Sequence, residues 1–431
     1  MIDPDLVRKE PDRVLANLER RRNPDFGRLF VEARAKDAEW RAAVVDADRL
    51  RQRRNQLSHE IAAERKKGVP SPTLDAEAKT IPDALRAIEG RETELRTASE
   101  ALLRRLPNLL DESVPYGKDD SENVVVAAWG ETGPARGDLA PHAEVLERLG
   151  MAEFERAHRA SGAGFYYLRG GAVLLDLALQ RFALDLLIER GFTPIAPPYL
   201  LRRGPYEGVT DLADFENVMY KVEGDDLYLI ATSEHPIAAL YLGEILDEGL
   251  LPIRLAGVST CFRKEIGGHG VDQKGVFRVH QFQKVEQFVF ARPEDSPGVH
   301  EELRANAEEV FRRLGVPYRV VNVCTGDVGT VAAKKYDIEA WFPRQRAYRE
   351  VVSCSNCTDY QARRLGIRLG KAGRPGKRVP HTLNSTAIAT ARALAVLVEQ
   401  YQQPDGSVTI PEVLRPYLGG MTALTLPSPG P

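Results

Sequence analysis

A seven-residue repeat of apolar side chains runs through the first quarter of the chain. Eight positions follow alternating steps of four and three residues, and six of them are apolar: Ile81, Leu85, Ile88, Glu92, Leu95, Ser99, Leu102 and Leu106. This spacing is the seam of a coiled coil. A weaker seam crosses the proline-free stretch 28–67, at Ala33, Trp40, Val44, Ala47 and Ile61. A glycine and two prolines within 68–72 separate the seams, which predicts two long helices packed as an antiparallel hairpin.

The outer half of this predicted hairpin is basic. Its positive side chains are Arg49, Arg51, Arg53, Arg54, Arg65, Lys66 and Lys67, set against Glu60 and Glu64. Helices of about forty residues, rising ~1.5 Å per residue, would form an arm roughly 60 Å long. A charge run is most often a solvated helix face. An arm that buries only its own seam needs another purpose, however, and a basic end suits phosphate contacts. We therefore expect the arm to bind nucleic acid.

Bulk composition excludes several other classes of protein. The 431 residues carry a net charge of only −3, so nucleic-acid binding has to come from a local patch. Four cysteines in a chain of this length do not make a disulfide framework. No apolar run reaches the ~18 residues of a membrane span. The N-terminal stretch mixes acids and bases without an apolar run, unlike a secretory signal. These features predict a cytosolic protein.

Beyond the arm, short apolar runs alternate with turns and helical patterns. Strands are predicted at 227–231, 255–261, 276–290, 318–323 and 348–353, and helices at 173–190, 236–246, 299–314 and 387–401. Strands joined by hairpins, with helices set to one side, predict an α+β domain on an antiparallel sheet. We expect an arm domain at 1–110, a linker at 111–165, a main domain at 166–420 and a disordered tail at 421–431.

Charged and aromatic side chains alternate along residues 261–290, CFRKEIGGHGVDQKGVFRVHQFQKVEQFVF, which predicts a strand, a glycine-rich turn and a returning strand. Side chains two apart share one face of a strand, so Arg263 and Glu265 point the same way. On the returning strand one face carries Arg278, His280, Phe282, Lys284 and Glu286, and the other carries Phe277, Val279 and Val285. The first face can clamp a polyphosphate, stack a purine and bind an ammonium group. Alternating charges on an exposed sheet are common. The aromatic ring of Phe282 among these charges, and the turn glycines Gly267, Gly268 and Gly270, favour a ligand site instead.

This segment resembles motif 2 of class II aminoacyl-tRNA synthetases, in the form found in the seryl-tRNA synthetase family. GFTPIAPPYL at 191–200 resembles motif 1, with Pro198 as its proline, and ATSEHPI at 231–237 resembles the T-x-E loop of the family. REVVSCSNCTDYQARR at 349–364 and HTLNSTAIATAR at 381–392 resemble the strand before motif 3 and motif 3 itself. The helical hairpin occupies the place of the family's tRNA-binding arm. The likeness therefore spans residues 1–420 and implies the class II synthetase fold.

The resemblance also implies roles for individual residues. Three would be catalytic: Arg263, Glu286 and Arg392. The ATP site would comprise Arg263, Lys264, Glu265, Arg278, Val279, Phe282, Glu350, Val351, Val352, Ser353 and Arg392, with arginines on the phosphates and Glu265 and Phe282 on the adenine. Glu350 and Ser353 would also hold a magnesium ion, which prefers hard oxygen ligands. The serine site would comprise Thr232, Ser233, Glu234, Arg263, Glu286, Asn384 and Thr386. Within it, Glu286 would bind the ammonium group, and Asn384 with Thr386 would face the hydroxyl.

The implied reaction activates L-serine with ATP. The serine carboxylate attacks the α-phosphorus, pyrophosphate leaves, and the 3′-terminal ribose of tRNA(Ser) attacks the resulting adenylate. Positioning and charge neutralisation would provide most of the rate. The implied partners are ATP, Mg²⁺, L-serine, tRNA(Ser), whose long variable arm the hairpin would contact, and a second copy of the chain. Whether selenocysteine tRNA is also charged stays open, and no membrane partner is expected.

Two other functions are compatible with parts of the sequence. A ligase that loads an amino acid onto a carrier protein belongs to the same family, but such relatives lack the arm. A catalytically silent paralogue should have lost some of Arg263, Glu286, Glu350 or Arg392, and all four are present. The chain departs from the family pattern at Ser233, Lys264, Lys274 and Cys357 without removing any of these groups. A zinc site at Cys354 and Cys357 would need a second ligand pair.

Overall fold

The computed structural model describes residues 1–133, 139–210, 216–265, 275–371, 374–376 and 378–426, in two compact units, Met1–Leu109 and Leu110–Pro431. Each unit has its own core, and each is described by itself below. The predicted turn glycines Gly267, Gly268 and Gly270, together with Lys274, lie outside the described residues.

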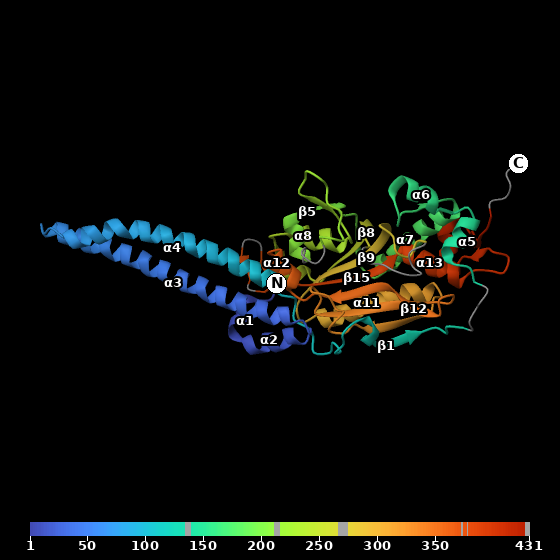
Figure 1. The fold of residues 1–431 in the computed structure, drawn as a ribbon, viewed down its shortest axis with the longest axis horizontal. Coiled ribbons are helices and arrows are strands. Elements are labelled where there is room, and N and C mark those ends of the chain that lie inside the picture. Colours follow the sequence, from blue (N-terminus) through green and yellow to red (C-terminus); the bar gives the residue numbers. More distant parts are fainter. Residues whose placement is uncertain (134–138, 211–215, 266–274, 372–373, 377, 427–431) are drawn as a thin grey trace. The chain divides into compact units, whose positions relative to one another are not determined.

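The first unit contains the predicted helical hairpin, which is confirmed. Helices α3 (Pro24–Lys66) and α4 (Pro72–Arg105) pack against each other along their lengths (Figure 1). Proline stands at the start of both helices, where its missing N–H costs no hydrogen bond, and the Asn23 side chain caps α3 by accepting from the Asp25 amide. Short helices α1 (Pro4–Lys9) and α2 (Pro11–Glu19) pack at the base of the hairpin.

The seam of the hairpin differs in detail from the predicted one. On α4 the buried residues are Ile81, Leu85, Leu95, Ser99 and Leu103, and the predicted Leu106 directly after the helix is buried as well. The seam therefore departs from the prediction at Leu103, which is buried in place of the half-buried Leu102. On α3 they are Phe30, Ala33, Asp37, Ala43, Ala47 and Leu57, while Trp40, Val44 and Ile61 are only half-buried. A straight helix drifts relative to a strict seven-residue repeat. Contact with α1 and α2 also decides which side chains are covered at the base.

The second unit is built on a large, mostly antiparallel sheet. Among the described residues its eight strands run in the order β1 (Val124–Trp129), β10 (Tyr318–Asn322), β11 (Lys334–Phe342), β12 (Ala347–Asn356), β15 (His381–Ala389), β9 (Gln281–Ala291), β8 (Ile253–Phe262) and β4 (Thr193–Ile195). Neighbouring strands are antiparallel except β4 and β8, which are parallel. The predicted α+β class is confirmed, and the large sheet contains this parallel pair in addition to its antiparallel ones.

Helix α11 (Ser296–Arg313) covers one face of the sheet. The Asn306 amide donates to Gln287 Oε1 at 2.8 Å, and Gln287 donates to the Leu303 carbonyl at 3.1 Å. Successive residues of a strand point to opposite faces. Glu286, next to Gln287 on β9, therefore points away from α11, toward the face that carries the candidate site.

Two predicted segments are more ordered than expected. The predicted linker 111–165 supplies β1, which pairs with β10, and α5 (His142–Arg148), whose Val145 and Leu146 are fully buried. The described part of the predicted disordered tail forms β17 (Ala423–Leu424), which pairs with β16 (Val408–Thr409) and buries Leu424 in the main core. In their described parts, both segments are ordered by long-range contacts, which a segment without a periodic pattern of its own does not reveal.

Two predicted helices were also partly wrong. The segment 236–246 contains the short helix α10 (Glu234–Ala238), a single 3₁₀ turn and the start of strand β7 (Ile245–Asp247). The segment 387–401 begins with the end of β15, and helix α13 (Thr390–Gln400) follows it. Helix α7 (Gly171–Glu189) ends before Gly191 as predicted. Among the described residues, no helix is both long and apolar enough to cross a membrane.

Candidate active site

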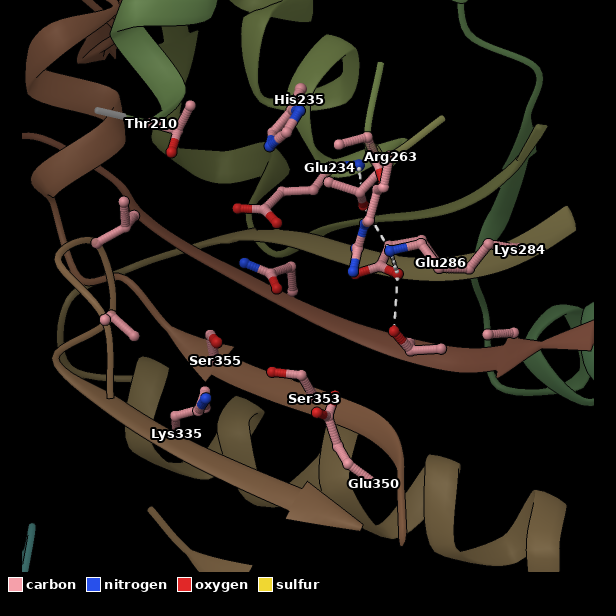
Figure 2. Close-up of a pocket in the computed structure, with 18 of the residues that line it drawn as sticks. Thr210, Glu234, His235, Arg263, Lys284, Glu286, Lys335, Glu350, Ser353 and Ser355 are labelled. Carbon is pink, nitrogen blue, oxygen red and sulfur yellow. Dashed lines mark hydrogen bonds and ion pairs between the residues drawn. The ribbon is translucent and has the colours of Figure 1, made fainter. Parts of the chain in front are cut away.

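A cavity of about 580 Å³ lies on the face of the sheet away from α11, a size typical of small-molecule sites. Strands β9, β12 and β15 form its floor, and the segments that follow β8 and β6 (Leu227–Leu229) form one wall (Figure 2). Thirteen predicted site residues line it: Thr232, Glu234, Arg263, Glu265, Val279, Phe282, Glu286, Glu350, Val351, Ser353, Asn384, Thr386 and Arg392. Residues from five separate sequence segments therefore converge on one space.

Two arginines of the cavity are each held against an aromatic ring. The Arg263 guanidinium lies 5.4 Å from the centre of the Phe282 ring, and its Nε donates to the Ala231 carbonyl at 3.2 Å. The Arg392 guanidinium lies 5.4 Å from the Phe277 ring, and its Nη1 contacts Glu350 Oε1 at 3.2 Å. Cation–π contacts and fixed hydrogen bonds orient both groups before any ligand binds. Such preorganised cations suit the phosphates of a nucleotide.

A buried ion pair lies on the floor of the cavity. Lys284 Nζ is 2.6 Å from Glu286 Oε2 and donates to Thr232 Oγ1 at 2.5 Å. The Thr386 hydroxyl donates to Glu286 Oε2 at 3.3 Å, because Thr386 and Glu286 are directly paired across β15 and β9. The side chains of Lys284 and Glu286 are only 5% and 2% exposed. Sequence reasoning placed Lys284 on the correct face but gave it no role.

Glu234 adds a second carboxylate to the cavity. It lies on the wall that follows β6, near Arg263 and Glu286 (Figure 2). Burial, together with the negative charge of Glu286, raises the pKa of Glu234 to about 7. The neighbouring His235 also lines the cavity. Burial and the positive charges of Lys284 and Arg263 lower its pKa to about 3, so its imidazole is neutral. Glu234 is thus a carboxyl group that a cationic ligand would stabilise in its ionised form.

Glu350 and Ser353 face the same cavity because β12 is irregular between them. Three residues apart on a regular strand, they would point to opposite faces. The pairing of β11 with β12 shifts register there, so that Val351 is an extra residue and re-aims Glu350. Desolvation acts to raise the pKa of Glu350, but the charges of Arg392, Lys335 and Arg263 outweigh it and hold the pKa below its ordinary value. The pair offers two oxygen donors of the kind that magnesium prefers.

Several cavity residues were not predicted from the sequence. They include Thr210, His235, Phe277, Lys284, Lys335, Ser355 and the loop 328–332. Lys335 Nζ lies 3.5 Å from Asp337 Oδ2 and donates to the Asp327 carbonyl at 3.4 Å. Burial acts to lower the pKa of Lys335, but Asp337 and Glu350 outweigh it and raise the pKa. Lys335 therefore adds a further cation to the cavity, beside Lys284 and the two arginines. The alternation of side chains along β11 could have placed Lys335 on the cavity face, but this strand was not predicted from the sequence.

Four predicted site residues do not line the cavity. Ser233 is fully buried behind it, Val352 belongs to the core, Lys264 lies over the Tyr220 ring, and Arg278 is exposed. The predicted alternation on the returning strand was wrong before Gln281, where β9 begins, since Phe277 and Val279 line the cavity instead. Alternation applies only within a strand. From Phe282 to Glu286 the predicted face is confirmed.

Two small residues shape the part of the cavity near Glu286 and Asn384. Gly257 of β8 pairs with Glu286. A Cβ atom at this position would lie 2.7 Å from Ser233 Oγ and 2.5 Å from Ile237, so only glycine lets the segment of Ser233 and Ile237 pack this closely on β8. Cys357 lines the cavity, and the Asn384 amide donates to its sulfur at 3.6 Å. Burial raises the pKa of the Cys357 thiol, which keeps it protonated.

The basic residues predicted on the arm fall into two groups. Arg49, Arg51, Arg53, Arg65 and Lys67 are each within ion-pair distance of a carboxylate of the arm. Arg53 makes a two-pronged contact with Glu77, with both distances 2.7 Å. Arg54 and Lys66 are exposed, and neither forms an ion pair with any other described residue. These two are the most available for an external anion.

Two family models match the chain. The seryl-tRNA synthetase N-terminal domain matches residues 1–110, and the class II core domain of tRNA synthetases (G, H, P, S and T) matches residues 218–401. The first match covers the helical hairpin, and the second covers most of the cavity.

Individual relatives agree with these matches over nearly the whole chain. A serine–tRNA ligase of Methanocella arvoryzae is 57% identical over 98% of this chain and 100% of its own. The seryl-tRNA synthetase of Pyrococcus horikoshii, solved in complex with ATP, superposes with a TM-score of 0.95 at 48% identity, covering 99% of this chain and 100% of that one. The cytoplasmic enzyme of Naegleria fowleri, solved with AMP, gives 0.90 at 34% identity, covering 99% of each chain. The chain therefore belongs to the serine–tRNA ligase family of class II aminoacyl-tRNA synthetases.

Proposed function

We propose that the cavity activates L-serine with ATP and transfers the seryl group to the 3′-terminal ribose of tRNA(Ser). The observation that carries this proposal is the meeting, in one cavity, of two arginines that lie against aromatic rings with the carboxylates of Glu234 and Glu286. Arginines suit the phosphates of ATP, and carboxylates suit the ammonium group of an amino acid. The structure of the Pyrococcus horikoshii relative with ATP supports the nucleotide part.

In the proposed first step the serine carboxylate attacks the α-phosphorus of ATP and pyrophosphate leaves. Arg263 neutralises charge at the α-phosphate, and Arg392 holds the γ-phosphate. Glu234 and Glu286 bind the ammonium group, and Asn384 with Thr386 faces the hydroxyl. A site that hydrogen-bonds a substrate hydroxyl rejects alanine, because the buried polar groups would be left unpaired. Glu265 and Phe282 engage the adenine, and Arg278 remains a predicted phosphate ligand.

Glu350 and Ser353 fit a magnesium ion by their oxygen donors and their shared position on the cavity wall. A bound magnesium ion would neutralise phosphate charge and orient the leaving pyrophosphate. Arg392 now contacts Glu350, so this arginine and the ion would share the carboxylate.

The overall reaction is tested by incubating the protein with labelled serine, ATP, Mg²⁺ and total tRNA. We expect serine to become attached to the tRNA. The matched control is the same tRNA after periodate oxidation, which destroys the terminal ribose and should abolish attachment. Equal labelling of both tRNA samples would contradict transfer to that ribose.

The helical hairpin of the first unit is proposed to contact the long variable arm of tRNA(Ser). Whether tRNA(Sec) is also charged stays open. Replacing Arg54 and Lys66 by glutamate should raise the KM for tRNA at least tenfold, because each lost phosphate contact removes salt-dependent affinity. The rate of ATP–pyrophosphate exchange should not change, since the substitutions lie in the other unit. Glutamate at Arg86, an exposed α4 arginine that pairs with Asp83, is the control for each of the two single substitutions, since it reverses one charge in the same way. Equal loss of charging and exchange would contradict the arm's role.

A homodimer in the cytosol completes the proposal. One side of α7 exposes Val173, Leu174 and Leu177, at 38%, 47% and 55% of their surface, and Tyr199 and Leu200 of the motif 1 segment are exposed as well. Apolar side chains gathered in this way favour burial against another protein surface. Light scattering should give twice the mass of the chain, and aspartate at Leu177 should reduce it.

A further inference from the structure

Gln361 lies behind the wall of the cavity, on the short helix α12 (Tyr360–Arg364), and is fully buried. Its amide nitrogen donates to Glu234 Oε1 at 2.7 Å and to the Val209 carbonyl at 3.3 Å. Its amide oxygen accepts from the Thr382 hydroxyl at 2.7 Å. These contacts join the carboxylate of Glu234 to strand β15 and to the end of helix α8 (Arg203–Val209).

The surroundings fix which way round the amide sits. A carboxylate oxygen and a backbone carbonyl both face the nitrogen, and both accept hydrogen bonds. If the amide were reversed, its oxygen would face these two acceptors at hydrogen-bond distance. The Thr382 hydroxyl can donate or accept, so it tolerates either orientation and does not compete. Gln361 is therefore held as a donor toward Glu234.

Glu234 needs such a donor because no cation pairs with it among the described residues. On β9, Lys284 is engaged by Glu286 and Thr232. Arg263, after β8, donates from Nε to the Ala231 carbonyl. Glu286, which lies on the neighbouring floor of the cavity, disfavours a second negative charge at Glu234. The neutral donor Gln361 is the only side chain seen to hydrogen-bond the carboxylate in the described structure.

We propose that Gln361 is a positioning residue for serine recognition, which keeps Glu234 ionised and aims its free oxygen at the substrate ammonium group. The proposal rests on the function given above. Helix α12 also holds the neighbouring cavity wall in place. Its residues Gln361 and Arg364 donate to the carbonyls of Val209, Glu207 and Thr210, and Val209 and Thr210 line the cavity.

The test compares Gln361→Met, which keeps the length but loses the amide, with Thr382→Val, which removes only the bond to the amide oxygen. In ATP–pyrophosphate exchange, Gln361→Met should raise the KM for serine about 10- to 100-fold, as expected for losing a hydrogen bond to a charged group. The KM for ATP and kcat should stay within about threefold, a difference too small to indicate a lost contact. Thr382→Val should change all three little.

The pH profile separates positioning from a general structural defect. Serine binds the ionised form of Glu234, so the wild-type KM for serine should rise as the pH falls below about 7. Gln361→Met lacks the donor, so in this variant the rise in KM should begin at a higher pH. Thr382→Val keeps the donor, so its rise should begin at the wild-type pH. If Gln361→Met does not fold, Gln361→Asn keeps the amide but falls short of Glu234, and should show the same changes.

An unchanged serine KM in these Gln361 variants, or a parallel rise of the serine and ATP KM values, would overturn the proposal. A wild-type protein without any serine-dependent exchange would instead overturn the proposed function, and the positioning role with it. The two failures are thus distinguished by the wild-type measurement.

Discussion

Replacing Arg263 by alanine should lower kcat/KM for serine-dependent ATP–pyrophosphate exchange about 10³-fold, the usual cost of removing a preorganised group that stabilises transition-state charge. Arg263 is preorganised because its Nε bonds the Ala231 carbonyl and its guanidinium lies on the Phe282 ring. Lysine at this position should recover only part of the loss, since it keeps the charge but not the planar fork. The measurement is exchange kinetics at saturating and limiting ATP.

The matched control for Arg263 is Arg254, an arginine of the preceding strand β8. Arg254 pairs with Glu302 at 3.0 Å and does not line the cavity. Alanine at Arg254 should leave exchange close to wild type. If both alanine variants lose exchange equally, the effect comes from the strand and not from phosphate contact, and the assigned role is wrong.

Replacing Glu286 by alanine should lower the free energy of unfolding by about 3–5 kcal/mol, because it leaves a buried ammonium without its counter-charge. Lys284 would keep only the Thr232 hydroxyl as its partner, in a place where its side chain is 5% exposed. The same variant should lose serine-dependent exchange. Denaturant unfolding measures the first effect and exchange kinetics the second.

A second substitution separates these two effects. Adding Lys284→Met to Glu286→Ala removes both charges, so most of the lost stability should return while exchange stays absent. The control is alanine at Glu412, whose exposed pair with Arg415 should contribute less than about 1 kcal/mol. If the double variant is no more stable than Glu286→Ala, the buried charge is not the cause of the destabilisation.

The sequence predicted those parts of the fold in which a local period decides burial. The heptad pattern identified the hairpin, and the two-residue period placed Phe282, Lys284 and Glu286 on the cavity face. Both predictions rest on geometry that a single element imposes on its own side chains. The prediction was wrong by one position at Leu102, where packing against other helices decides which residue is covered.

The remaining features depend on contacts between distant segments. Strand β1 is held by β10, almost two hundred residues further along the chain, and its own sequence does not show this pairing. The irregularity at Val351 turns Glu350 into the cavity, and regular alternation would have separated it from Ser353. Gln361 has partners at 209, 234 and 382, so nothing near it in the sequence marks it as part of the site.

Amino-acid dependence of ATP–pyrophosphate exchange, measured without tRNA, tests the central claim most directly. The carboxylates of Glu234 and Glu286 should select an ammonium group. Asn384 and Thr386 should select a small side chain with a hydroxyl group. Serine should therefore support exchange far better than alanine, which lacks the hydroxyl, or threonine, which adds a methyl group. Exchange that is faster with alanine, with threonine or with no amino acid would contradict the assignment of this cavity to serine activation.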